Sequence, residues 1–133
     1  MPELTGPSNA MIMSMRHIVK YPDCNATDNL FGGQMMAWID EGAALYASCQ
    51  MKTSRLVTRL FGAVEFRVPV PRGSVCTVYT GTAQTGKTSL KVHVKVTTND
   101  FGAGADSEKV VCETDLVFVA VDENGKSTPW RKP

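Results

Sequence analysis

The sequence predicts an α+β domain in which an antiparallel β-sheet curls around one long helix. An apolar segment of helical length, Gln34–Cys49, is followed from Leu56 onward by segments in which apolar and polar residues alternate. Turn-forming residues separate those segments, and no second helical segment lies between them to make a parallel crossover. Strands without crossover helices pair as antiparallel hairpins, so the class is α+β.

The first element expected is a short strand over Met13–Val19, which ends before Pro22 and the turn-rich stretch DCNATDN. The helix begins just after that stretch. Eleven of its sixteen residues from Gln34 to Cys49 are apolar, and they fall on every side of a helical wheel. We therefore expect a helix that is covered all round. The methionines Met35 and Met36, with Trp38, are expected in its core contacts.

The rest of the chain reads as strands joined by turns. Val64, Phe66 and Val68 alternate with charged residues before the turn PVPRGS. The remaining extended segments are CTVYTGTA, then the run in which Leu90, Val92, Val94 and Val96 oppose Lys91, His93 and Lys95, and finally VVCETDLVFVAV. At least four strands are predicted.

Length and composition favour one globular domain. The chain has 133 residues, of which 43% are hydrophobic and 20% charged. We expect a flexible tail over 1–12 and a single domain over 13–133. The longest apolar run, Leu116–Val121, is far shorter than a membrane span, and MPELTGPSNA lacks the pattern of a secretory signal. A cytoplasmic location is expected.

Charge and cysteine spacing exclude two further classes. The net charge is +1, from fourteen basic and thirteen acidic residues, and the basic residues form no block that could track a phosphate backbone. No nucleic-acid partner is expected. The four cysteines, Cys24, Cys49, Cys76 and Cys112, form no C-x-x-C pair and only two histidines accompany them. They are expected as reduced thiols, and no metal site is expected.

Asp40 is the residue that asks for an explanation, because its carboxylate falls within the apolar helix. A structural role at a polar contact is one reading. The other is catalytic, because Gly32 and Gly33 open the helix and leave its first N–H groups accessible to developing negative charge. Gly33 and Asp40 share a helix face but are separated by about 10 Å of rise. Two antiparallel copies of the helix in a dimer would bring one glycine end beside the other copy's acid.

These residues belong to a recognisable pattern. The stretch DCNATDNLFGGQMMAWIDEGAAL, with VEFRVPVPRGS, GKTSL and FVAVDENGK, resembles the hotdog-fold acyl-CoA hydrolases of the YciA-like and cytosolic group. The resemblance runs from about Arg16 to Pro129. It implies a hotdog fold and an acyl-CoA thioesterase of lipid metabolism, which releases free fatty acid and coenzyme A and works as a homodimer or as a hexamer built from three dimers. Coenzyme A is part of substrate and product, so no cofactor is implied.

The resemblance also assigns roles. Asp40 matches the general base or nucleophile, Asn25 matches a loop asparagine that holds the water or the thioester, and Gly33 with Gly32 matches the oxyanion hole. The segment Lys87, Thr88 and Ser89 matches one that lies near bound coenzyme A, with Arg72 and the basic pair Arg131–Lys132 as further candidates. Asp28 and Asn29 stand where relatives often have glycine first, and either tolerates a left-handed turn.

Thioester hydrolysis can proceed with only one base and an oxyanion hole, because a thiol of pKa about 8.5 leaves without help from an acid. Alternatives remain. One is an acyl-CoA-binding or sensing module in which Asp40 is structural, and another is a hotdog hydratase or dehydratase, which needs a histidine near the helix. Glu41 is a weaker candidate base, since it points about 100° away. A Cys24–His17 nucleophile pair lacks an orienting acid, and His93 falls on the charged face of its strand.

Overall fold

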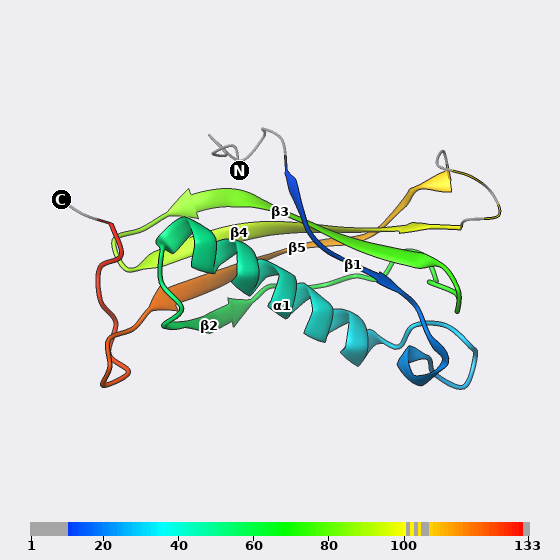
Figure 1. Cartoon of the computed structure of the whole chain (residues 1–133), viewed down its shortest axis with the longest axis horizontal. Helices are drawn as coiled ribbons and strands as arrows, with labels where there is room; N and C mark the ends of the chain where they lie inside the picture. The colour runs from blue at the N-terminus through cyan, green and yellow to red at the C-terminus, as the bar shows by residue number, and fades with distance from the viewer. Residues whose placement is uncertain (1–10, 101, 103, 105–106, 132–133) are drawn as a thin grey trace.

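The computed structural model describes residues 11–100, 102, 104 and 107–131. Five strands form one antiparallel sheet in the order β1-β3-β4-β5-β2, and helix α1 lies across one face of it (Figure 1). The elements, in chain order, are β1 (Ile12–Ile18), the short 3-10 helix η1 (Tyr21–Asp23), α1 (Gly32–Met51), β2 (Leu56–Phe61), β3 (Val75–Thr85), β4 (Ser89–Asn99) and β5 (Lys109–Ala120). The predicted α+β class and the curled sheet around one long helix are confirmed.

The centre of the sheet follows the alternation seen in the sequence. Strands β3, β4 and β5 pair as consecutive hairpins, with Val94 opposite Thr80 on one side and Thr114 on the other. The valines of β4, Val92, Val94 and Val96, are completely buried on the face that α1 covers. The intervening residues Lys91, His93 and Lys95 are partly exposed on the opposite face. The predicted two faces of this strand are confirmed.

Helix α1 lies very close to the sheet at its middle. Ile39, Ala43 and Ala47 are completely buried, and Gly42 faces β1 and β3. A Cβ atom at position 42 would lie 2.9 Å from Cγ1 of Val78 and 3.2 Å from Sδ of Met15. Only glycine allows this approach without displacing those side chains.

The sequence predicted that the helix packs on its own sheet and, in part, on a second copy. Within one chain it is not covered on every side. Met36 is 39% exposed and Leu45 is 50% exposed. At about 100° per residue these two side chains lie on opposite flanks of α1. The neighbouring edge strand β2 also leaves Val57 and Leu60 about half exposed. Apolar side chains of both α1 and β2 therefore stay exposed in the single chain.

The alternating segment around Val64–Val68 is not a strand, which corrects the sequence reading. The strand that pairs with β5 is β2, which ends at Phe61. Beyond Gly62 the chain runs as an irregular segment with single contacts, such as the bond from the Arg67 N–H to the Val111 carbonyl. Pro69 and Pro71 lack N–H groups, so a continuous ladder of hydrogen bonds could not extend through this segment.

The sequence also predicted an N-terminal tail and no membrane span. The expected tail over 1–12 falls largely on residues outside the described part, and β1 begins at Ile12. The single domain over 13–133 therefore stays a proposal. Among the described residues, no helix combines the length and apolar character that a membrane crossing requires.

Candidate active site

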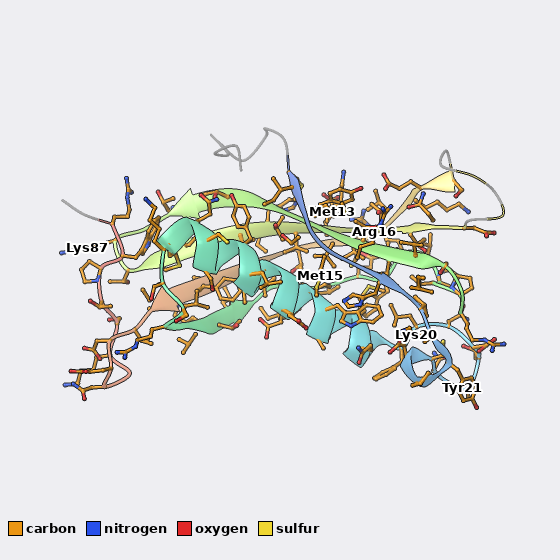
Figure 2. All side chains as sticks on the ribbon, viewed as in Figure 1. Met13, Met15, Arg16, Lys20, Tyr21 and Lys87 are labelled. Atoms are coloured by element: carbon orange, nitrogen blue, oxygen red, sulfur yellow. The ribbon has the colours of Figure 1, made fainter. Side chains whose placement is uncertain are left out.

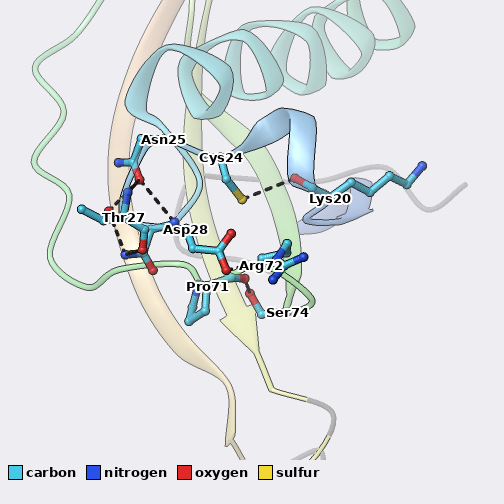
Figure 3. Close-up of polar contacts among 9 residues, drawn as sticks. Lys20, Cys24, Asn25, Thr27, Asp28, Pro71, Arg72 and Ser74 are labelled. Carbon is cyan, nitrogen blue, oxygen red and sulfur yellow. Dashed lines mark hydrogen bonds and ion pairs between the residues drawn. The ribbon is translucent and has the colours of Figure 1, made fainter.

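Asn25 organises the loop that leads into α1. Its side-chain carbonyl accepts hydrogen bonds from the Thr27 N–H at 3.0 Å, from the Thr27 hydroxyl at 2.6 Å and from the Asn29 N–H at 3.3 Å (Figure 3). The amide oxygen is thus occupied by the turn. Its amide nitrogen has no partner among the residues described. The turn therefore holds Asn25 with two N–H groups left to donate.

The same loop is tied to the segment before β3. Asp28 adopts a left-handed conformation with φ of 64°, as the sequence predicted for this turn. Its carboxylate accepts a hydrogen bond from Nε of Arg72 at 3.1 Å (Figure 3). The backbone N–H of Arg72 in turn donates to the Asp28 carbonyl. These contacts fix the loop on residues 70–74, so the entry to the helix has a defined position.

Helix α1 begins without a side-chain cap. Its N-cap residue is Phe31, in extended conformation, and phenylalanine offers no acceptor to the first turn. The Met35 N–H donates to the Phe31 carbonyl, whereas the N–H groups of Gly32, Gly33 and Gln34 find no acceptor within the described ranges. Uncapped N–H groups at a helix start carry partial positive charge. The predicted oxyanion site therefore has donors that no protein group uses.

Asp40 is half-buried rather than fully buried in the single chain. Its Oδ1 accepts a hydrogen bond of 2.8 Å from the hydroxyl of Thr58 on β2. The other oxygen, Oδ2, has no partner among the residues that the structure describes. Thr58 thus orients the carboxylate and leaves one oxygen for a reacting group.

Sequence reasoning missed Thr58. It lies eighteen residues after Asp40, and nothing in the pattern LVTRLF distinguishes it from other polar strand positions. Only the packing of α1 beside β2 makes the contact.

The predicted catalytic residues lie in two places within one chain. Asn25 and Gly32 line a hollow of about 350 Å³ at the start of α1, together with Met35, Phe66 and Val68. Asp40 is not part of that hollow. The regular helix from Gly32 to Met51 keeps Gly33 and Asp40 about two turns apart, roughly 10 Å. Each chain therefore carries two separate halves of the expected constellation.

The competing catalytic candidates are otherwise engaged. Cys24 Sγ donates to the Lys20 carbonyl, and desolvation, followed by the charges of Asp28 and Asp23, raises the pKa of that thiol, which disfavours a thiolate. The imidazole of His17 stacks on Trp38 with ring centroids 4.2 Å apart. No Cys24–His17 pair forms. All four cysteines are free thiols, as predicted.

His93 and Glu41 are the other alternative candidates from the sequence. His93 sits between Asp115 and Glu113 on the sheet face opposite α1, at 2.7 Å and 3.1 Å, as expected for a residue on the charged face. Glu41 is exposed on the helix.

The residues expected near coenzyme A do not gather in one chain. Lys87 and Thr88 lie in the β3–β4 turn and Ser89 begins β4, where Trp130 donates its indole N–H to the Ser89 carbonyl. Arg72 lies 5.9 Å over the ring of Tyr21. Figure 2 shows Lys87 and Tyr21 at opposite ends of the molecule. Arg72 lines a second hollow, of about 540 Å³, with Ser74, Thr98 and Lys109. No cluster of potential metal ligands occurs among the described residues.

One long helix laid across a five-stranded antiparallel sheet is the hotdog arrangement. Residues 27–105 match the family model of the thioesterase superfamily. The chain belongs to that superfamily.

Relatives and solved structures agree. The chain is 32% identical over 124 residues to an uncharacterised acyl-CoA thioester hydrolase of Haemophilus influenzae, covering 92% of this chain and 79% of the relative. It is 29% identical over 113 residues to the acyl-CoA thioester hydrolase YciA of Escherichia coli, covering 84% and 85%.

Two solved structures are similar over most of their length. The hexameric thioesterase of Yersinia pestis superposes with a TM-score of 0.84 at 27% identity, covering 96% of this chain and 99% of the other. The acyl-CoA hydrolase of Staphylococcus aureus, solved with butyryl coenzyme A and coenzyme A, superposes with a TM-score of 0.80 at 26% identity, covering 94% and 74%. Variants of that enzyme in which one aspartate or one threonine is replaced by alanine have also been solved.

Proposed function

We propose that this protein is an acyl-CoA thioesterase that hydrolyses acyl-CoA to a free acid and coenzyme A. The observation that carries the proposal is that one chain has both helix N–H donors and an oriented carboxylate oxygen that no described residue engages. Membership of the thioesterase superfamily, and relatives named as acyl-CoA thioester hydrolases, support it.

In the proposed reaction Asp40 takes a proton from water through Oδ2, and the hydroxide attacks the thioester carbonyl carbon. The carbonyl oxygen becomes an oxyanion beside the N–H of Gly33, with the amide N–H groups of Asn25 as further donors. One such donor is typically worth about 3 to 4 kcal/mol of transition-state stabilisation. Collapse of the intermediate breaks the C–S bond and releases the coenzyme A thiolate, which needs no strong acid.

The alternative route, in which Asp40 itself attacks and forms a mixed anhydride, uses the same residues. A single turnover in water labelled with oxygen-18 separates the two routes. Direct attack by water places the label in the acid product, whereas the anhydride route places label in the Asp40 carboxylate when water opens the anhydride at that carbon.

The proposed active form is a homodimer, or a hexamer of three dimers. Within one chain Gly33 and Asp40 are too far apart for one carbonyl, whereas an antiparallel partner helix would place the partner's acid beside the glycines. Met36 and Leu45 of α1 stay exposed in the single chain, so a second copy packed on the helix would have apolar side chains to cover. The hexameric thioesterase of Yersinia pestis, which is similar in structure, supports the higher assembly. Coenzyme A is then proposed to contact Arg72, or Lys87, Thr88 and Ser89, with the two sets supplied by different copies.

We place this activity in the cytoplasm as part of the same proposal, supported by four free thiols. A non-catalytic acyl-CoA-binding module is the alternative that the same fold allows.

The test compares wild type with Asp40→Asn by thiol release from acetyl-, butyryl- and octanoyl-CoA. Loss of general-base catalysis should lower kcat by about 10²- to 10⁴-fold with the assembly intact by light scattering. The control is Glu41→Gln, which removes the adjacent carboxylate and should keep wild-type turnover. Full activity in Asp40→Asn would refute the assignment, and binding of acyl-CoA without hydrolysis by wild type would favour the binding module.

A further inference from the structure

The two glycines at the start of α1 accommodate two aromatic rings. A Cβ atom at position 32 would lie 3.1 Å from Cε2 of Phe66, and a Cβ atom at position 33 would lie 2.9 Å from Cε2 of Phe31. Real Cβ atoms rarely approach so closely. The diglycine is therefore a docking place for the edges of two phenyl rings, as well as a source of accessible N–H groups.

Both rings remain largely uncovered. Phe31 is 40% exposed and Phe66 is 44% exposed, although each could bury more area in the core of a domain of this size. They reach the helix from different segments, because Phe31 is the N-cap residue and Phe66 belongs to the irregular segment after β2. Core packing alone does not explain why two phenyl rings stay partly exposed beside the start of α1.

The two rings differ in what they face. Phe66 lines the hollow of about 350 Å³ that contains Asn25 and Gly32, where Leu30, Met35 and Val68 add further apolar wall. Phe31 does not line that hollow. The hollow thus joins a polar rim, at Asn25, to an apolar wall that the Phe66 ring completes. This division suits a group with a polar reacting end and an apolar body.

We infer that Phe66 is a specificity-determining residue whose ring sets the size of the acyl group accepted at this site. The inference rests on the proposed thioesterase function. With the carbonyl held at the Gly33 N–H, an acyl chain that extends into the hollow meets the Phe66 ring, whereas the polar pantetheine arm finds few partners on that wall. Glycine at position 32 lets the ring sit against the helix and so fixes the width of the hollow.

The experiment measures kcat/KM for acetyl-, butyryl- and octanoyl-CoA in four proteins: wild type, Phe66→Ala, Phe66→Leu and Phe31→Ala. Removing the ring should raise the ratio of octanoyl- to butyryl-CoA efficiency by about tenfold, as expected for a few methylene-sized contacts, with a smaller change in the same direction for Phe66→Leu. Phe31→Ala is the matched control. It removes an equally exposed ring beside the other glycine, and should change all three substrates by a similar factor.

A second arm tests the same contact from the helix side. Gly32→Ala displaces the Phe66 ring, so it should alter the octanoyl-to-butyryl ratio in the wild-type background. In the Phe66→Ala background the same substitution should leave that ratio nearly unchanged, whatever its effect on the overall rate. This arm keeps the inference testable if Phe66→Ala does not fold. An unchanged ratio in Phe66→Leu and Gly32→Ala, or an equal shift in Phe31→Ala, overturns the inference. Failure of wild type to hydrolyse any of the substrates would instead overturn the proposed function.

Discussion

The two faces of this sheet treat polar groups in opposite ways. On the face away from α1, His93 contacts both Asp115 and Glu113, Arg67 lies 3.7 Å from Glu113, and Lys91 lies 4.0 Å from Asp115. On the α1 side, the N–H groups at the helix start and one oxygen of Asp40 have no protein partner in the described part of the chain.

The difference distinguishes polar groups that stabilise the fold from polar groups that are available for a reaction. Charges that alternate in sign across neighbouring strands satisfy one another and hold the strands in register, without needing anything else. Donors and acceptors that the folded chain leaves unused and partly exposed remain available to water or to a bound ligand. If this is correct, substitution of the unpaired groups should lower kcat, and substitution of the paired groups should change only the free energy of unfolding.

The largest effect in this comparison is expected at Asn25. Asn25→Asp keeps a side-chain oxygen for the bonds from Thr27 and Asn29, so the turn should survive. It removes the two free N–H donors and adds negative charge near the developing oxyanion. Removal of a donor of this kind typically costs about 10²- to 10³-fold in kcat. Steady-state thiol release checks it, and a loss below threefold with a folded assembly would show that Asn25 serves only the turn.

Thr58→Val should have the next largest effect. The variant preserves the shape of the side chain and removes the hydroxyl that donates a hydrogen bond to Oδ1 of Asp40, at 2.8 Å between the two oxygens. A hydrogen bond to a charged group is worth about 1.5 to 3 kcal/mol, so kcat should fall by about tenfold or more while KM changes little. Thr58→Ser retains the hydroxyl and should recover most of the rate. Equal loss in both variants would mean that the methyl group, rather than the hydroxyl, matters.

His93 provides the contrasting case on the other face, where stability but not turnover should change. Partial burial lowers the pKa of His93, but hydrogen bonds to the Asp115 and Glu113 carboxylates outweigh it and raise the pKa above 6.5. The two contacts are both satisfied only by the protonated ring. The stabilisation is therefore complete below about pH 6.5 and is lost as the pH rises through the raised folded-state pKa.

The free energy of unfolding of His93→Gln, measured by urea denaturation, should accordingly fall below that of wild type by about 0.5 to 1 kcal/mol in the acidic range. The difference should shrink as the pH rises above neutrality. A difference that stays constant from about pH 5.5 to pH 8.5 would contradict the role of the ring proton.

Lys91 should give the smallest effect. Its ammonium group lies 4.0 Å from the Asp115 carboxylate, and both side chains are 40% exposed. Exposed pairs of this kind contribute little, so Lys91→Met should change the free energy of unfolding by less than about 0.5 kcal/mol. A loss comparable with that of His93→Gln would show that the charges on this face act as one network, which a double variant would measure.

Prediction from sequence succeeded where local spacing decides the outcome. The faces of β4 follow from the alternation of valines with Lys91, His93 and Lys95, and α1 follows from the length of its apolar run. The left-handed turn at Asp28 follows from the residue type.

Prediction failed where contacts join distant segments. The alternation at Val64–Val68 looked as strand-like as that of Leu56–Phe61, and the prolines that follow decide against it. Thr58 meets Asp40, and Phe66 meets Gly32, only because of how β2 and the segment after it lie beside the helix. The separation of the two candidate catalytic groups, Gly33 and Asp40, along α1 follows from helix geometry and was predicted from the sequence. The Thr58 hydroxyl and the Phe66 ring could not be predicted from spacing.

The strand order has a consequence for how the chain acquires its fold during synthesis. Both edge strands and the helix lie within the first 61 residues, whereas the three central strands come afterwards. On a ribosome, α1 emerges before the strands β3, β4 and β5 that bury it. The apolar residues of α1 therefore stay exposed until residue 120 has left the exit tunnel. The strands β3, β4 and β5 are neighbours in sequence, so they can then pair quickly, and the earlier segments can pack onto them. Nascent chains stalled before that point should remain open to proteases and chaperones, because the central strands of the sheet are synthesised last.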